Sequence, residues 1–266
     1  GNNSGSLFAL SRFNIFKNKV EDRIRLISSD ATNQVSKMFG NTAGIIVARR
    51  GKLDNLPIVE QSKIIENLQP LDILLEKAPF RLTDYLIPGY WSHVALWSGT
   101  EKDLKELEVW DELPVIYQDA VEKFHYSGPD FQGTIRLGHM VIEALRPGVQ
   151  INTLQHFLNI DDLGVIRFNG LTIENKRSYL LNAFSQIGKS YDFNFDVESK
   201  NEIVCSELIY VSFDDLDWNT EKTMGRFTIS PDNVVQKLSN NNVEPVLLYI
   251  NGTEITKNIE EDFPLE

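Results

Sequence analysis

Five short apolar runs constrain the fold of this chain more than any other feature of its sequence. Runs of five or six residues rich in Val, Ile and Leu, with turn-forming residues near their ends, are typical of buried β-strands. They occupy residues 72–76, 93–98, 139–144, 163–168 and 246–250. Helical patterns lie before, between and after them, so the sequence predicts an α+β fold with an antiparallel sheet packed against helices.

The helical segments are predicted from apolar residues that recur at steps of three and four. They cover residues 7–38, 58–67, 101–123 with a break near Pro114, 153–159, 174–187, 204–213 and 232–239. Residues 43–50 are predicted to form a short strand or buried segment. Two stretches, 125–138 and 191–203, are predicted to be irregular, and the last strand is predicted to begin just after Pro245.

The chain of 266 residues divides into four predicted segments. Residues 1–6 are small and polar and are expected to be disordered. Residues 7–67 are predicted to be an N-terminal helical extension packed on the core. The main domain spans residues 68–250, and residues 251–266 form an acidic tail that is expected to be frayed from Glu254 onward.

The formal net charge of −12 narrows the range of partners. Nucleic acids are polyanions, so an acidic chain argues against nucleic-acid binding. No stretch of about 18 apolar residues is present, and the sequence therefore predicts no membrane-spanning helix. Residues 7–27 are amphipathic and partly basic, which fits either peripheral contact with a membrane or a cover for the core.

Cys205 is the single cysteine of the chain. One cysteine excludes an intrachain disulfide and any zinc site built from several thiolates, and the sequence predicts no metal and no cofactor. Cys205 begins the apolar helical run 204–213. The start of a helix favours a thiolate and offers backbone N–H groups to an oxyanion. The residues alone leave open a catalytic nucleophile and a buried structural cysteine.

A nucleophilic cysteine needs an imidazole within hydrogen-bond reach. Among the four histidines, His93 and His139 each begin a predicted strand and are equal candidates. His156 is expected at the surface or half-buried on a helix, and His125 lies in an irregular polar stretch. Glu143 stands in an otherwise apolar strand, where it would either orient the imidazole or point outward to solvent.

A set of motifs in a particular order resembles a known family. The motifs are LDILL (71–75), SHVALWSG (92–99), VIEA (141–144) followed by GV (148–149), YDF (191–193), VCSELIY (204–210) and ISPD (229–232). They span about residues 68–240 and resemble the circularly permuted papain-like cysteine amidases and peptidases of the NlpC-type superfamily, in the YiiX/YaeF-like group. In one departure, Leu71 stands where this group usually has Gly before Asp72, which we expect to affect only a turn.

The resemblance implies roles for three residues. Ordinary papain-like enzymes have the cysteine before the histidine, whereas here His93 precedes Cys205, which is the order of the permuted branch. The resemblance implies Cys205 as nucleophile, His93 as base and Glu143 as the third polar residue. It also implies a permuted papain-like catalytic domain over 68–250, and a location in the cell envelope or periplasm.

Four further residues are candidates for substrate binding or support of the oxyanion site. Tyr191 and Asp192 match the family motif that precedes the nucleophile. Ser206 follows Cys205 at the start of the helix. Trp91 is close to His93 in the sequence, and we expect it to contact substrate.

Three functions are compatible with these observations. The resemblance favours a hydrolase that cleaves an amide in a cell-wall peptide or related molecule, through a thioester acyl-enzyme. A thiol acyltransferase or lipid-directed hydrolase is the first alternative, because the related lecithin:retinol-type acyltransferases share the permuted arrangement. A non-catalytic binding protein on the same scaffold is the second. The expected partner is a small peptide, amide or acyl substrate.

Overall fold

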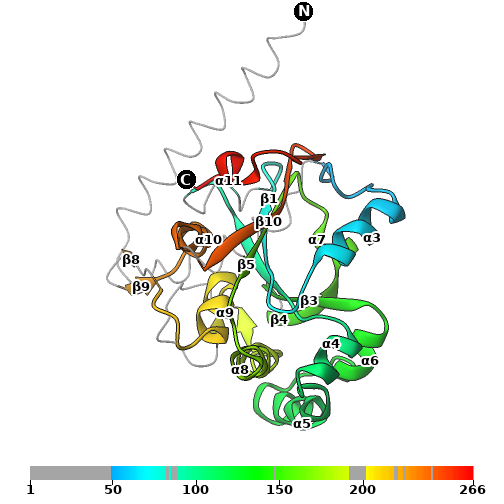
Figure 1. Cartoon of the computed structure of the whole chain (residues 1–266). Helices are drawn as coiled ribbons and strands as arrows, with labels where there is room; N and C mark the ends of the chain where they lie inside the picture. Colours follow the sequence, from blue (N-terminus) through cyan, green and yellow to red (C-terminus); the bar gives the residue numbers. More distant parts are fainter. Residues whose placement is uncertain are drawn as a thin grey trace, which may run out of the picture.

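An antiparallel sheet forms the centre of the computed structural model (Figure 1). The structure describes residues 49–81, 84, 89–146, 148–191, 202–218, 221–223, 226–240 and 242–265. Among them, seven strands lie side by side in the order β11 (Thr253–Glu254), β10 (Val243–Ile250), β5 (Asp162–Phe168), β1 (Ile73–Lys77), β2 (His93–Trp97), β3 (His139–Leu145) and β4 (Gly148–Thr153). Every neighbouring pair is antiparallel, which confirms the predicted fold class.

Helices cover both faces of this sheet (Figure 1). On one face lie α8 (Ile173–Phe184) and α9 (Cys205–Ser212), and α10 (Pro231–Val235) packs beside α9. The opposite face is covered by α3 (Ile58–Asn67) and α7 (Leu154–Phe157). The site described below lies where α9 begins against the sheet.

The remaining elements lie outside this framework. They are α4 (Glu101–Glu106), η2 (Trp110–Glu112), α5 (Leu113–Phe124), α6 (Phe131–Arg136), η3 (Gln236–Ser239), α11 (Ile259–Asp262), and the strand pairs β6 (Ser190–Tyr191) with β7 (Glu202–Ile203) and β8 (Glu221–Thr223) with β9 (Arg226–Thr228). Figure 1 shows α4, α5 and α6 grouped together at one end of the molecule.

Burial on both faces explains why the central strands are apolar without interruption. In β2, Val94 and Leu96 belong to the hydrophobic cluster beneath α8 and α9, whereas Ala95 and Trp97 belong to the cluster on the opposite face. All four are at most 1% exposed. Because successive side chains of a strand point to opposite faces, a strand buried on both sides must be apolar at every position.

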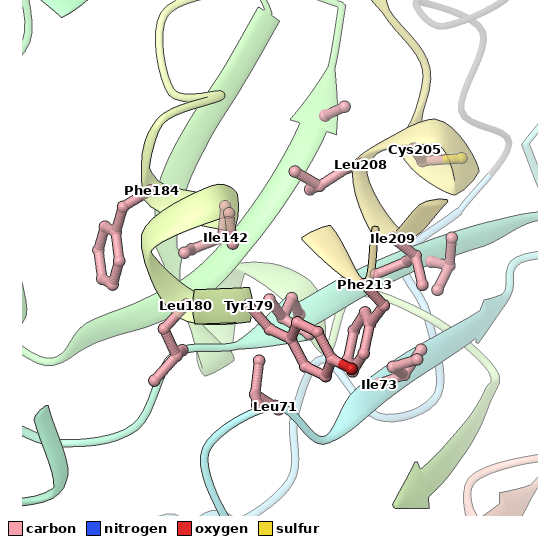
Figure 2. Packing of buried hydrophobic residues seen from close by; sticks show 14 of the residues in the cluster. Leu71, Ile73, Ile142, Tyr179, Leu180, Phe184, Cys205, Leu208, Ile209 and Phe213 are labelled. Carbon is pink, nitrogen blue, oxygen red and sulfur yellow. The ribbon is translucent and has the colours of Figure 1, made fainter. Parts of the chain in front are cut away.

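The cluster beneath α8 and α9 fixes the helix that carries Cys205. Figure 2 shows α9 contributing Leu208 and Ile209 to this cluster, opposite Ile73 and Ile142 of the sheet, with Cys205 at the edge of the group. Both α9 side chains are fully buried. Removing apolar surface of this size from water is worth about 1.5–3 kcal/mol per side chain, so the position of Cys205 is set by packing along its helix.

Several helices agree with the sequence. The prediction for 58–67 is confirmed by α3, the prediction for 204–213 by α9, and the break near Pro114 by the separation of α4 from α5. Pro114 is the second residue of α5, where its missing N–H is not needed by the helix.

The prediction of an irregular stretch over 125–138 is wrong, because α6 lies within it. The Asp130 carboxylate accepts a hydrogen bond from the Gly133 N–H at 2.7 Å, and Phe131 and Ile135 are buried. An N-terminal cap and two core contacts outweigh the low helix propensity of Gly133. The described residues of the predicted loop 191–203 also depart from it, since Tyr191 belongs to β6 and Glu202–Ile203 form β7.

The last strand begins earlier than predicted. Rather than starting after Pro245, β10 begins at Val243 and includes the proline. The register against β5 shifts between Pro245 and Leu247, which marks an irregularity in the pairing. Proline lacks the N–H that a regular ladder needs, so a bulge is where a strand accepts it.

The tail is packed against the core and is not frayed as predicted. Its α11 is followed by Phe263, which is 3% exposed and stacks against Trp91 with ring centroids 5.6 Å apart. The Trp91 indole N–H donates to the Pro264 carbonyl oxygen at 2.9 Å. An apolar residue in an otherwise acidic segment is the sequence signal for this contact.

Leu71, the position at which the sequence departs from the motifs that it resembles, has φ of +75°. This left-handed conformation is free of strain for glycine and costs a leucine roughly 1–2 kcal/mol. The Leu71 N–H donates to the Trp97 carbonyl at 2.8 Å, and the side chain is 3% exposed in the core. Burial therefore compensates for the backbone strain, and the departure concerns a turn.

Several predictions fall outside the described residues. These are the disordered segment 1–6, the amphipathic segment 7–27 and most of the predicted strand 43–50. Residues 49–67 belong to the predicted N-terminal extension, and their Leu53 and Ile64 are buried in the cluster that includes α7. In the described part of the chain, no helix has the length and apolar character needed to cross a membrane.

Candidate functional site

A largely buried histidine–glutamate pair lies between β2 and β3, with 11% of the His93 side chain and 2% of the Glu143 side chain exposed. His93 is the first residue of β2, and its Nε2 lies 2.9 Å from Oε2 of Glu143 on β3. The other oxygen of Glu143, Oε1, accepts a hydrogen bond from the Asn152 amide at 2.8 Å. Glu143 is 2% exposed, so water does not compete for these bonds. The carboxylate is therefore fixed by two donors and orients the imidazole.

Cys205 completes a three-residue arrangement. It is the first residue of α9 and is 4% exposed, and its charge and hydrogen bonding act to raise the pKa of His93. Because Glu143 occupies Nε2, Nδ1 is the ring nitrogen that remains for the sulfur. The Glu207 carboxylate accepts from the Val204 N–H at 2.8 Å and caps the start of the helix. The chain thus brings together the three residues that the resemblance implied.

The charges of this group support one another. Burial by itself would lower the pKa of His93, but the charge of Cys205, its hydrogen bond and the Glu143 hydrogen bond outweigh burial and raise that pKa well above 6.5. Burial would likewise raise the pKa of Glu143, but the hydrogen bond and charge of His93, with the Asn152 amide, lower it. The group therefore favours an imidazolium beside an ionised Glu143.

A second buried carboxylate adds to the field at His93. Glu76 is the register partner of His93 in the β1–β2 pair and is 4% exposed. Burial raises its pKa, although the Arg81 guanidinium, 2.5 Å away, acts in the opposite direction. The charge of Glu76 contributes to the raised pKa of His93.

The geometry of β2 gives His93 its position. Only Leu96 and Trp97 of β2 pair with β3, so His93 lies beyond the paired part of the two strands. Helix α9 packs against both strands. The start of α9 can therefore meet the imidazole there, while the body of the helix stays on the hydrophobic cluster.

The other histidines have different surroundings. His139 and His93 were equal candidates from the residues alone, and it is His93 that meets Cys205, while the His139 ring lies 3.3 Å from the Ile151 carbonyl oxygen. His125 adopts a left-handed conformation at the end of α5. The His156 side chain is 58% exposed, as expected for a surface helix, yet its Nε2 is 3.9 Å from Oε1 of Glu143.

The four candidate supporting residues differ in position. Ser206 is buried, and its hydroxyl donates to the Ile229 carbonyl at 2.6 Å, which ties α9 to the segment before α10. Tyr191 is partly buried against the main cluster. Asp192 lies outside the described residues. Trp91 is fully buried, so the expectation of substrate contact is corrected: its indole has no exposed surface and serves packing.

Sequence reasoning missed three residues around Glu143 and His93. The Asn152 amide donates a hydrogen bond to Glu143, and Glu76 is the register partner of His93 on the neighbouring strand. His156 Nε2 lies 3.9 Å from Oε1 of Glu143. In the sequence, the signal for Glu76 is a charged residue at the end of the buried, apolar part of β1. Among the residues that the structure describes, no group of three or more His, Cys, Asp or Glu side chains is arranged to hold a metal ion.

Comparisons with known proteins identify the family of this chain. A crystal structure of the metalloprotein yiiX from Escherichia coli O157:H7 matches with a TM-score of 0.46 and 15% identity, over 68% of this chain and 97% of that one. No protein with a curated description matches the chain. The family model of permuted papain-like amidase enzymes, YaeF/YiiX, matches residues 67–257, well over half of the chain. The chain therefore belongs to the YaeF/YiiX, or C92, family of permuted papain-like amidases.

Proposed function

We propose that the chain is a cysteine-dependent amidase in which Cys205 is the nucleophile, His93 the base and Glu143 the residue that orients His93. One observation carries the proposal: the His93 imidazole lies 2.9 Å from the Glu143 carboxylate, and Cys205 at the start of α9 interacts with the same imidazole and acts to raise its pKa. A nucleophile, a base and a group that orients the base are the parts that covalent catalysis requires. Membership of an amidase family supports the same class of reaction.

The reaction proceeds in two halves. His93 takes the proton of Cys205, and the thiolate attacks the amide carbonyl carbon to form a tetrahedral oxyanion. Backbone N–H groups at the start of α9 stabilise that charge. The C–N bond breaks as His93 protonates the leaving amine, which leaves a thioester on Cys205. His93 then removes a proton from water as the water attacks the thioester carbonyl, and collapse of the tetrahedral intermediate releases the carboxylic acid and leaves the Cys205 thiolate beside protonated His93.

The raised pKa of His93 suits its role as an acid and base in this mechanism. Its pKa is raised well above 6.5 by Cys205 and Glu143 in spite of burial. A raised pKa keeps the imidazolium present at neutral pH, where it stabilises the thiolate and later donates its proton to the amine. Glu143, whose pKa is lowered mainly by His93 against the effect of burial, remains ionised throughout.

The substrate belongs to the proposal as well. We propose a small peptide or related amide, with cell-wall peptides in the cell envelope as the first class to test. Short peptides and peptide amides are incubated with the protein, and release of amine is measured. Acyl esters form a second panel, and transfer to an added amine or alcohol instead of water would identify an acyltransferase.

Single substitutions test the roles of the residues. Cys205→Ala and His93→Ala are expected to abolish measurable turnover, and Cys205→Ser to reduce it strongly. His139→Ala is the matched control, since His139 also begins a strand but its ring lies 3.3 Å from the Ile151 carbonyl oxygen, and it is expected to retain turnover. Mass spectrometry of the wild type after rapid quenching is expected to show an acyl group on Cys205. Full turnover in Cys205→Ala or His93→Ala would refute the mechanism.

A further inference from the structure

The loop that leads into β2 is held by a carboxylate from a distant part of the chain. Oδ2 of Asp232 accepts a hydrogen bond from the Tyr90 N–H at 2.7 Å, and Oδ1 accepts from the Trp91 N–H at 3.0 Å. Asp232 lies in α10 and is 7% exposed. Both donors are within three residues of His93, so this bidentate contact acts directly on the segment that places the imidazole.

The backbone at Gly89 approaches the Asp232 carboxylate so closely that no side chain would fit between them. The φ of Gly89 is +98°, and a Cβ added to it would lie 1.5 Å from Oδ2 of Asp232. No side chain fits at such a distance, so only glycine lets the loop approach the carboxylate this closely. The loop and Asp232 are therefore matched to each other in shape as well as in hydrogen bonding.

The segment that carries Asp232 is also tied to the nucleophile helix. The hydroxyl of Ser206, the residue after Cys205, donates to the Ile229 carbonyl at 2.6 Å. Asp232 follows Ile229 by three residues, and α10 packs against α9. Residues 229–232 thus contact the chain immediately beside the nucleophile and the chain immediately before the base.

We propose that Asp232 is a positioning residue that sets the distance between the His93 imidazole and the Cys205 sulfur. The inference rests on the proposed function, because it assumes that His93 acts on Cys205. Asp232 acts on the imidazole through the backbone N–H groups of Tyr90 and Trp91. A displacement of about 1 Å between reacting groups can cost about a hundredfold in rate.

The loop has other anchors, so the loss of Asp232 should shift it without releasing it. The Ser92 N–H donates to the Glu76 carbonyl at 2.9 Å, and the Tyr90 hydroxyl donates to Asp162 at 2.5 Å. These contacts keep the loop against the sheet when Asp232 is replaced. The expected change is a misplaced imidazole in a folded protein.

The test measures how fast iodoacetamide alkylates Cys205 between pH 5 and pH 9, which needs no substrate. Wild type is expected to react at least tenfold faster at pH 6 than His93→Ala, because the imidazolium favours the thiolate. Asp232→Asn retains the shape of the side chain but only one acceptor oxygen. It is expected to lose most of that advantage at pH 6, while its far-UV circular dichroism is unchanged.

Ser230→Ala is the matched control. It breaks the capping contacts between Ser230 and Asn233 at the start of the same helix and leaves both Asp232 bonds in place. It is expected to lower the urea midpoint of unfolding with no change in the alkylation profile. Asp232→Glu, which keeps both acceptor oxygens one methylene further out, replaces Asp232→Asn if that variant does not fold, with the same loss expected.

The outcomes separate the two proposals. If wild type reacts no faster at pH 6 than His93→Ala, the proposed function fails. If wild type shows the advantage and the folded Asp232 variant keeps it in full, the positioning role is refuted while the proposed function stands. Failure of both Asp232 variants to fold would assign the residue to folding and would also overturn the inference.

Discussion

Replacing Glu143 with glutamine removes a charge from the site while keeping the size of the side chain. Glu143 accepts two hydrogen bonds, one from His93 through Oε2 and one from Asn152 through Oε1. Glutamine has one acceptor oxygen and one amide nitrogen, so it can satisfy only one of these donors. Either the imidazole or the Asn152 amide must lose its partner at a carboxylate position that is only 2% exposed.

The size of the effect follows from the bond that is lost. A hydrogen bond to a charged group contributes about 1.5–3 kcal/mol, and about 1.4 kcal/mol corresponds to a factor of ten. Glu143→Gln is therefore expected to reduce kcat/KM by roughly 10- to 100-fold. It also removes one cause of the raised pKa of His93, so that pKa falls and the imidazolium is lost at a lower pH.

The assay is amide turnover from pH 5 to pH 9, supplemented by the alkylation rate of Cys205. Glu101→Gln is the matched control, because Glu101 is a surface carboxylate that pairs with Arg136 and Lys105. It is expected to leave activity and its pH dependence unchanged. If Glu143→Gln retains turnover within twofold of the wild type over the whole range, Glu143 does not orient His93.

Three other perturbations have defined outcomes. Trp91→Ala should lower the free energy of unfolding by about 3–5 kcal/mol in urea titrations, because it removes a buried indole that stacks on Phe263. Arg167→Ala should cost about 3–5 kcal/mol and lower the Tm, since it strips the buried Asp72 carboxylate of bonds at 2.7 and 2.6 Å. The third perturbation is His93→Gln, for which the difference in free energy of unfolding from wild type is compared across pH. Because folding raises the pKa of His93, the extra stability of wild type should be largest below about pH 6.5 and decline at higher pH. An extra stability that grows with pH would contradict this.

The framework of the fold was predictable from local patterns. Strands buried on both faces leave uninterrupted apolar runs, as in β1 and β2, and α3 and α9 leave a helical period. The failures have physical causes that lie outside those patterns. A cap at Asp130 stabilised a helix around a glycine, and a bulge accepted Pro245 inside a strand.

Only part of the candidate site could be predicted from the sequence. The order of His93 and Cys205, together with the motifs around them, identified the pair, whereas their spacing alone left His139 as an equal candidate. Asn152 was not predictable, because its contact with Glu143 depends on the register of β3 against β4. Trp91 was misjudged because closeness in sequence to His93 says nothing of which way an indole points.

Within the described residues, β4 and β11 are the two edge strands of the sheet. Neither edge offers a long row of free backbone groups with which another strand could pair. Strand β11 is two residues long. On β4, the Val149 N–H donates to the Lys189 carbonyl at 2.9 Å, and the Val149 carbonyl accepts from the Gly188 N–H at 3.0 Å. Folded proteins can aggregate by pairing through exposed strand edges, so the segment 188–190 protects the edge of the sheet at β4 from such pairing. Because β4 also carries Asn152, loosening this segment would both expose the sheet edge to aggregation and disturb the Glu143 carboxylate that Asn152 holds.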